Sequence, residues 1–190
     1  MSGRDVIRDG FPRRIVIIGG QGGGNGFMSQ ARRFTDKTEI VLLEKGPYVG
    51  TVKCGLAHYL AGTVPNRDTL VPTDPIALAK RFRSDIRIKQ EVICIDRELK
   101  ILIVHDLKSD ATYELSYDKL VLATGASPAI PAGLAGVDLP GVRCLRTIAD
   151  IDGIVEQLRD APASHATVVG AGTIGLQAAE AFGISDFQSK

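Results

Sequence analysis

The sequence predicts an α/β fold built around a parallel sheet, on three observations. Two short apolar runs, residues 15–18 and 166–169, are each followed at once by a glycine-rich turn, at 19–24 and 170–175. A helical pattern follows each turn, and after the first helix a further apolar run, 39–44, ends in an acidic residue. Strand, glycine turn, helix and strand in this order form a βαβ unit, the building block of a Rossmann-like nucleotide-binding domain.

The residues between the two turns complete a first domain. Periodic apolar residues predict a helix over 74–83, and alternating segments at 86–95, 101–105 and 112–115 predict a strand and a small antiparallel β-meander. The run 120–125 predicts a buried strand that ends in a turn of small residues. The expected architecture is a Rossmann-like domain with a small meander, followed by the first β-α unit of a second Rossmann-like domain.

A loop rich in proline and glycine divides these two domains. We expect residues 1–127 to form the N-terminal part of the first domain without its return segment, 128–145 to form a linker, and 146–190 to begin the second domain. Helices are expected over about 148–158 and 174–182. The sequence stops before a strand that could carry a second ribose-binding carboxylate, so we expect a truncated chain whose second site is incomplete.

Composition excludes several functional classes. The 190 residues are 44% hydrophobic, which is enough for a sizeable core and excludes a disordered chain. With 23 basic and 22 acidic side chains the net charge is +1, so we expect no nucleic-acid partner. No run is long enough to span a membrane, and the N-terminus lacks a signal peptide. The three widely spaced cysteines resemble neither a disulfide framework nor a metal site, so a cytoplasmic protein is expected.

The glycine turns lie where a pyrophosphate could bind. Closely spaced glycines let the backbone approach the anion, and the helix N-terminus that follows supplies free amides and a partial positive charge. Glu44, at the end of the second strand, can accept both hydroxyls of an adenosine ribose, and its charge would repel a 2′-phosphate. The second turn, Gly170-Ala171-Gly172-Thr173-Ile174-Gly175, matches the full dinucleotide fingerprint.

Cys54 is the candidate for redox chemistry. It is expected at the N-terminus of a short helix and next to Lys53, and both would favour the thiolate. His58, four residues on, could face Cys54, although a packed or solvated histidine is the simpler interpretation. An inert, buried cysteine is the alternative for Cys54, and it is the interpretation that we give to Cys94 and Cys144.

Taken in order, these features resemble the single-cysteine branch of the pyridine nucleotide-disulfide oxidoreductases, and most closely the coenzyme A-disulfide reductase group with its NADH oxidase and NAD(P)H sulfur reductase relatives. The chain is similar to a C-terminally truncated member of that family. The resemblance is carried by residues 15–20, Glu44 and Lys45, 54–56, 117–128, 145–147, the second glycine turn, and 179–182.

The resemblance implies FAD at the first turn, NADH or NADPH as co-substrate at the second, and Cys54 as the catalytic residue. NAD(P)H would reduce FAD, and the flavin would reduce a disulfide or other oxidised form of Cys54, with a small-molecule thiol or disulfide as substrate. The implied cofactor-binding residues are Gly19, Gly20, Gly22, Gly23, Gly24, Glu44, Lys45, Ala123, Thr124, Gly125, Gly170, Gly172, Thr173, Ile174 and Gly175. The implied substrate-binding residues are Gln30, Arg33 and Lys53.

Two interpretations of the function stay open. The first is a fragment of an FAD-dependent oxidoreductase, whose full-length relatives form homodimers through a domain that is absent here. The second is a non-catalytic, truncated module that binds a dinucleotide or a partner chain. The family usually shows Ser-Phe-x-Asn-Cys-Gly-Leu-Pro-Tyr around its cysteine, whereas residues 50–58 read Gly-Thr-Val-Lys-Cys-Gly-Leu-Ala-His.

Overall fold

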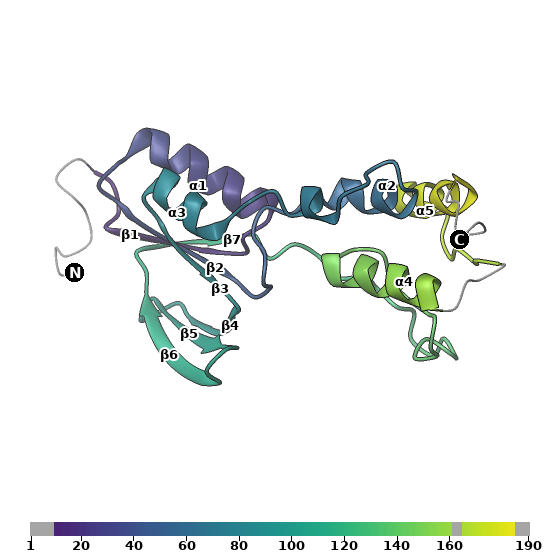
Figure 1. Ribbon diagram of the computed structural model, residues 1–190. Helices are drawn as coiled ribbons and strands as arrows, with labels where there is room; N and C mark the ends of the chain where they lie inside the picture. Colours follow the sequence, from purple (N-terminus) through teal and green to yellow (C-terminus); the bar gives the residue numbers. More distant parts are fainter. Residues whose placement is uncertain (1–9, 161–164, 185–190) are drawn as a thin grey trace. The chain divides into compact units, whose positions relative to one another are not determined.

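The computed structural model describes residues 10–160 and 165–184, and the chain divides into two compact units (Figure 1). The first unit contains the described residues up to Thr51 together with Thr73–Ala126. The second contains Val52–Pro72 together with the described residues from Ser127 onward. A parallel sheet, an antiparallel sheet and helices are all present, which confirms the predicted α/β class.

The first unit is centred on a four-stranded parallel sheet in the order β3-β2-β1-β7. β1 (Arg14–Ile18) pairs with β2 (Glu39–Glu44) on one side and with β7 (Lys119–Leu122) on the other, and β3 (Asp85–Ile88) extends the sheet beyond β2. Because these strands are parallel, the carboxyl ends of β1, β2 and β7 meet at one edge. The first glycine turn begins at that edge, the position at which open α/β sheets bind their ligands.

Helices cover one face of this sheet. α1 (Gly22–Phe34) and α3 (Pro75–Phe82) lie on the same side of it in Figure 1. Since side chains alternate along a strand, β1 directs Ile15 and Ile17 into this layer. Met28 of α1 is fully buried in the same cluster, and it fixes the helix against the strand that leads into the glycine turn.

A second, antiparallel sheet covers the opposite face. It consists of β4 (Gln90–Asp96), β5 (Ile101–Asp106) and β6 (Ala111–Ser116), in that order, and it confirms the predicted meander. The segment predicted over 86–95 is divided between β3 of the parallel sheet and β4 of this sheet. The core between the two sheets contains Val16, Val41, Leu43, Leu102, Val104 and Leu115. The parallel sheet is therefore buried on both faces, as its continuous apolar strands require.

The helices α3 and α1 begin in different ways. α3 starts at Pro75 after Asp74, whose carboxylate accepts hydrogen bonds from the amides of Ile76 and Ala77, each at 3.1 Å. This confirms the helix predicted over 74–83. α1 starts at Gly22, within the glycine turn, so the glycines themselves form the first helical turn.

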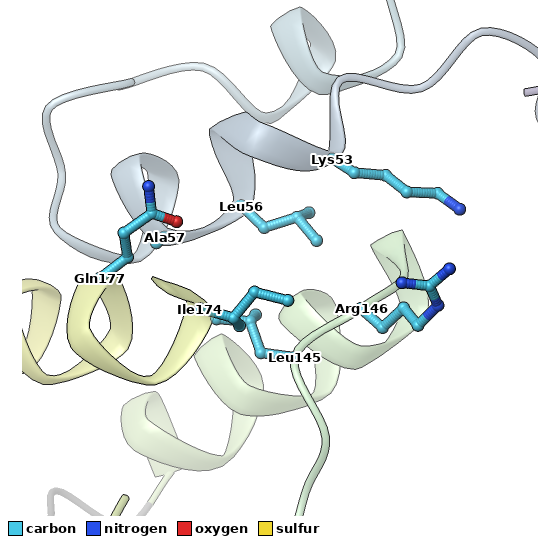
Figure 2. Close-up of a pocket in the computed structure, with 7 residues that line it drawn as sticks. All are labelled: Lys53, Leu56, Ala57, Leu145, Arg146, Ile174 and Gln177. Carbon is cyan, nitrogen blue, oxygen red and sulfur yellow. The ribbon is translucent and has the colours of Figure 1, made fainter. Parts of the chain in front are cut away.

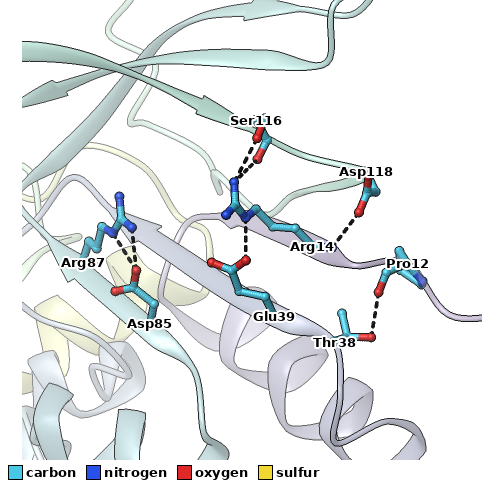
Figure 3. A network of polar contacts seen from close by, with 8 residues as sticks. All are labelled: Pro12, Arg14, Thr38, Glu39, Asp85, Arg87, Ser116 and Asp118. Atoms are coloured by element: carbon cyan, nitrogen blue, oxygen red, sulfur yellow. Dashed lines mark hydrogen bonds and ion pairs between the residues drawn. The ribbon is translucent and has the colours of Figure 1, made fainter. Parts of the chain in front are cut away.

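A network of polar contacts fixes the beginning of β1 (Figure 3). Arg14 Nε donates to Glu39 Oε2 at 2.8 Å, and Arg14 Nη1 donates to Ser116 Oγ at 2.9 Å. The backbone amide of Arg14 donates to Asp118 Oδ2 at 2.7 Å. Residues from both neighbouring strand regions therefore hold the start of the strand whose far end carries the glycine turn.

The second unit is helical in its described part. It contains a 3-10 turn, η1 (Lys53–Gly55), followed by α2 (Leu56–Leu60), a second 3-10 turn, η2 (Arg67–Leu70), and the helices α4 (Ile148–Asp160) and α5 (Thr173–Ile184). The predicted helices over about 148–158 and 174–182 are thus confirmed, each two residues longer at its C-terminal end. The buried apolar residues of this unit are Leu56, Ala57, Leu60, Leu70, Ile148, Ile151, Ala178 and Ala181.

Three local expectations are wrong. Residues 166–169 do not form a strand, because no strand among the described residues pairs with them, and Val169 is 90% exposed. The strand predicted over 120–125 is not buried along its length, since β7 lies at the edge of the sheet and Leu122 is 64% exposed. Cys54 lies inside a 3-10 turn, not at the N-terminus of an α-helix.

Within residues 10–160 and 165–184, no helix is both long enough and apolar enough to cross a membrane.

Candidate dinucleotide-binding site

The first glycine turn is built by contacts that only glycine allows. Gly19 has a φ of 104°, and a Cβ there would collide with the carbonyl group of Ala123. A Cβ at Gly24 would collide with the carbonyl oxygen of Gly19, and one at Gly20 would lie 2.8 Å from Val49 Cγ1. Glycine is therefore required at these positions for the tight turn and for close packing of α1 against β1.

The open side of the turn presents uncapped amides. Gln21 is the N-cap residue of α1, but its side chain makes no capping hydrogen bond, and the first turn contains no acidic residue. Gly22 and Gly23 are exposed, and a Cβ at Gly22 would meet no atom within 4 Å. The first amides of a helix have no intrahelical partner, so this end of α1 can bind an anion.

Glu44 lies at the end of β2, beside this turn. Its Oε2 accepts a hydrogen bond from the amide of Gly20 at 2.7 Å, and its Oε1 accepts one from the amide of Gly46 at 2.7 Å. The carboxylate therefore holds the turn and the loop after β2 together. Because each carboxylate oxygen can accept more than one hydrogen bond, Glu44 retains capacity for ribose hydroxyls.

The other residues that we expected to bind the cofactor near the first turn differ in their contacts and exposure. The structure brings Ala123, at the end of β7, against the turn: its amide donates to the Ile18 carbonyl at 2.8 Å. Thr124 and Gly125 follow as exposed residues. Lys45 is exposed, and its Nζ lies 2.7 Å from Glu91 Oε1.

The second glycine turn, in the second unit, repeats the local geometry of the first. Gly170 has a φ of 113°, and a Cβ at Gly175 would collide with the Gly170 carbonyl oxygen. Gly170 thus corresponds to Gly19, and Gly175 to Gly24. Gly172 faces open space, and α5 begins directly after it with Thr173 and Ile174. This helix N-terminus can bind an anion in the same way.

Cys54 has an exposed side chain in the middle of η1. The turn is closed by a hydrogen bond from the amide of Gly55 to the carbonyl of Val52 at 3.0 Å. His58 is also exposed, and the structure records no hydrogen bond between it and Cys54. Cys54 is therefore not buried. The expectation of a buried cysteine is wrong for Cys94 as well, which is exposed on β4, and Cys144 is only partly buried.

A small pocket of about 60 Å³ lies beside this turn in the second unit (Figure 2). Leu56, Leu145 and Ile174 form its apolar lining, and the cationic side chains of Lys53 and Arg146 also line it. The pocket joins the residue before Cys54 to the first residues of α5. Two cations at its border favour an anionic group near Cys54.

The other two expected substrate residues, Gln30 and Arg33, are exposed on α1. The neighbouring Arg32 is instead structural: its guanidinium donates to the carbonyls of Thr35, Thr38, Phe82 and Arg83, at 2.7 to 3.1 Å. Desolvation by burial lowers the pKa of Arg32, and the charge of Arg83 lowers it further. No group of three or more His, Cys, Asp or Glu side chains that could hold a metal occurs in the described part of the chain.

Comparison with known proteins identifies the family. Residues 13–189 match the family described as pyridine nucleotide-disulphide oxidoreductase. The chain belongs to this family. The coenzyme A disulfide reductase of Staphylococcus haemolyticus is 31% identical to this chain, and the match covers 88% of this chain. The match spans 37% of the length of that relative.

Solved structures agree with this assignment and confirm the resemblance seen in the sequence. The reduced CoADR-RHD of Bacillus anthracis has a TM-score of 0.84 and 32% identity, covering 90% of this chain and 31% of that chain. The NAD-dependent persulfide reductase of A. fulgidus also has a TM-score of 0.84, with 34% identity over 92% of this chain and 32% of its own. Both solved proteins therefore share the fold of the described residues.

Sequence reasoning missed one polar residue of the first turn. Gln21 lies between the glycines, and its side chain makes hydrogen bonds to residues 27 and 30 positions further along the chain. The sequence did contain a signal for Gln21: when the two glycine turns are aligned, Gln21 stands opposite Gly172, so a long polar side chain replaces a glycine.

Proposed function

We propose that this chain is part of an FAD-dependent oxidoreductase that transfers electrons from NAD(P)H to a small-molecule disulfide such as coenzyme A disulfide. The observation that carries the proposal is the first glycine turn, where Gly19 and Gly24 are packed against backbone while Gly22 faces open space. A Cβ would fill the packed side of this cradle, and the uncapped amides of α1 remain on its open side.

The residues around the turn fit a dinucleotide. The amides at the start of α1 would bind the pyrophosphate, and Glu44 would accept the ribose hydroxyls while it holds Gly20 and Gly46. Ala123, Thr124 and Gly125 would lie near the nucleotide from β7. In the second unit, Gly170, Gly172 and Gly175 would bind the pyrophosphate of NADH or NADPH at the N-terminus of α5.

Cys54 would be the residue that exchanges electrons with the substrate. When bound, FAD would supply the chemistry that accepts a hydride from NAD(P)H and passes two electrons to a disulfide. The exposed Sγ of Cys54 would form a mixed disulfide with one half of the substrate, and Lys53 and Arg146 would attract its anionic groups. Overall, one S–S bond is broken, and NAD(P)H and a proton are consumed to give NAD(P)+ and two thiols.

The test has two parts. The chain is titrated with FAD and followed by flavin fluorescence, and the FAD-loaded chain is then mixed with NADH and coenzyme A disulfide while NADH loss is recorded. We expect saturable FAD binding, and turnover that Cys54→Ser abolishes and Cys94→Ser, at another exposed cysteine, leaves intact. Failure to bind FAD, or equal turnover of Cys54→Ser and the unchanged chain, would reject the proposal.

The alternative is a module that binds a dinucleotide without catalysis. The absence of strand pairing at residues 166–169 in the described part of the chain favours it, because a second nucleotide site needs a sheet to support its turn. FAD binding without NADH oxidation in the same experiment would support this alternative.

A further inference from the structure

Gln21 stands where the second turn has Gly172. In dinucleotide turns the glycine at this place lets the backbone approach the pyrophosphate. A longer side chain is compatible with such an approach only where it is held away from the open side of the turn. The Gln21 side chain is held by hydrogen bonds to Tyr48 and Thr51.

All three polar contacts of the Gln21 side chain are made to the loop after β2. Its Nε2 donates to the carbonyl oxygen of Tyr48 at 2.9 Å. Its Oε1 accepts hydrogen bonds from the Thr51 amide at 3.0 Å and from Thr51 Oγ1 at 2.7 Å. Gln21, the N-cap residue of α1, is therefore bonded to both ends of the segment 48–51.

The backbone joins the same two parts. The amide of Gly50 donates to the carbonyl oxygen of Gly20 at 2.9 Å, and Val49 is fully buried in the core beneath the turn. Gly50 has a φ of 65°, and a Cβ there would lie 3.0 Å from Asn25 Nδ2 in the first turns of α1. Segment 48–51 is thus packed against the N-terminus of α1.

Thr51 is followed directly by Val52, Lys53 and Cys54. The η1 turn that carries Cys54 is closed by the hydrogen bond from the Gly55 amide to the Val52 carbonyl, and Val52, the N-cap residue of η1, is bonded covalently to Thr51. We propose that Gln21 is a positioning residue that fixes the start of the Cys54 segment to the helix end at which the pyrophosphate would bind. The roles of Cys54 and of the pyrophosphate in this statement rest on the proposed function.

Amide hydrogen exchange on the whole chain tests the link. In Gln21→Ala we expect exchange at Thr51 to rise about tenfold, because its amide loses its acceptor, and exchange at Gly55 to rise about threefold through the loosened segment. Thr51→Val, which removes the hydroxyl donor, should reproduce part of the rise at Gly55, and Thr51→Ser should restore the exchange rate of the unchanged chain. Thr112→Val, at an exposed position of β6, is the control.

The outcomes separate this inference from the proposed function. A rise confined to Gly50 and Thr51, with Gly55 unchanged in a variant that keeps its circular dichroism spectrum, would overturn the positioning role. A failure of Thr51→Ser to restore slow exchange would overturn it as well. Absence of FAD binding by the unchanged chain would reject the proposed function, while the exchange comparison, which needs no FAD, still decides the role of Gln21.

Discussion

At the scale of a single residue, Glu44 has a structural role beside the ribose-binding role that the sequence predicts. The sequence predicts a ribose ligand from its place at the end of a strand, and the structure adds that its two oxygens hold the amides of Gly20 and Gly46. A carboxylate that accepts backbone hydrogen bonds is fixed in position before a ligand arrives. The ribose role remains a prediction. A mutational test of it has to measure FAD affinity and stability separately, because Glu44 also has a structural role.

Glu44→Ala should raise the Kd for FAD at least about tenfold, because hydrogen bonds to a charged group contribute roughly 1.5–3 kcal/mol. The Tm should also fall, since two amides beside the turn lose their acceptor. Fluorescence titration and thermal melts measure the two effects, with Glu114→Ala, at an exposed position of β6, as the control. Unchanged FAD affinity in Glu44→Ala would contradict the ribose assignment.

At the scale of elements, the strand β1, the first turn and α1 act together. The turn is tight because Gly24 packs on the carbonyl of Gly19, and the open position beside it, Gly22, has no such neighbour. Glycines that are close in sequence thus have different physical reasons to be present. Close packing requires glycine at positions 19 and 24, whereas a side chain can be added at Gly22 without a collision.

This difference predicts opposite effects for two alanine substitutions in one helix. Gly24→Ala should cost about 1–3 kcal/mol of stability by overpacking and should weaken FAD binding. Gly22→Ala should keep the fold and gain up to about 1 kcal/mol, because alanine is the better helix former. Urea denaturation of both variants checks the prediction, and similar losses in both would show that the turn is not packed as described.

At the scale of the whole molecule, the two units have separate cores. The first is buried between helices and a second sheet, and the second depends on a small set of apolar residues in its helices. A dinucleotide that binds only the folded cradle would stabilise the native state by mass action.

FAD at about 100 times its Kd should therefore add about 2.7 kcal/mol to the free energy of unfolding and raise the Tm of the chain. Riboflavin, which has no pyrophosphate or adenosine ribose, should raise it much less. Thermal melts with each ligand provide the measurement. An equal shift with both compounds would mean that the isoalloxazine ring alone is bound, and the pyrophosphate cradle would lose its support.

Elements that depend on local interactions were predicted correctly from the sequence, and elements that depend on distant partners were not. The meander, α3 and α4 are encoded by local periodicity and capping, and their positions were predictable. Residues 166–169 were predicted as a strand from their apolar run and the glycine turn that follows it, but a strand also needs a partner. The 3-10 turn at Cys54 could not be distinguished from a helix start over so few residues.

By itself the sequence determined the βαβ opening, the two glycine turns and the family, because strand periodicity and the steric demand for glycine act over a few neighbouring residues. The tertiary structure alone decided that Gln21 is bonded to Tyr48 and Thr51, that Glu44 bridges Gly20 and Gly46, and that Cys54 is exposed. These facts depend on which distant segments come together, and side-chain hydrogen bonds between such segments form only once the chain has folded.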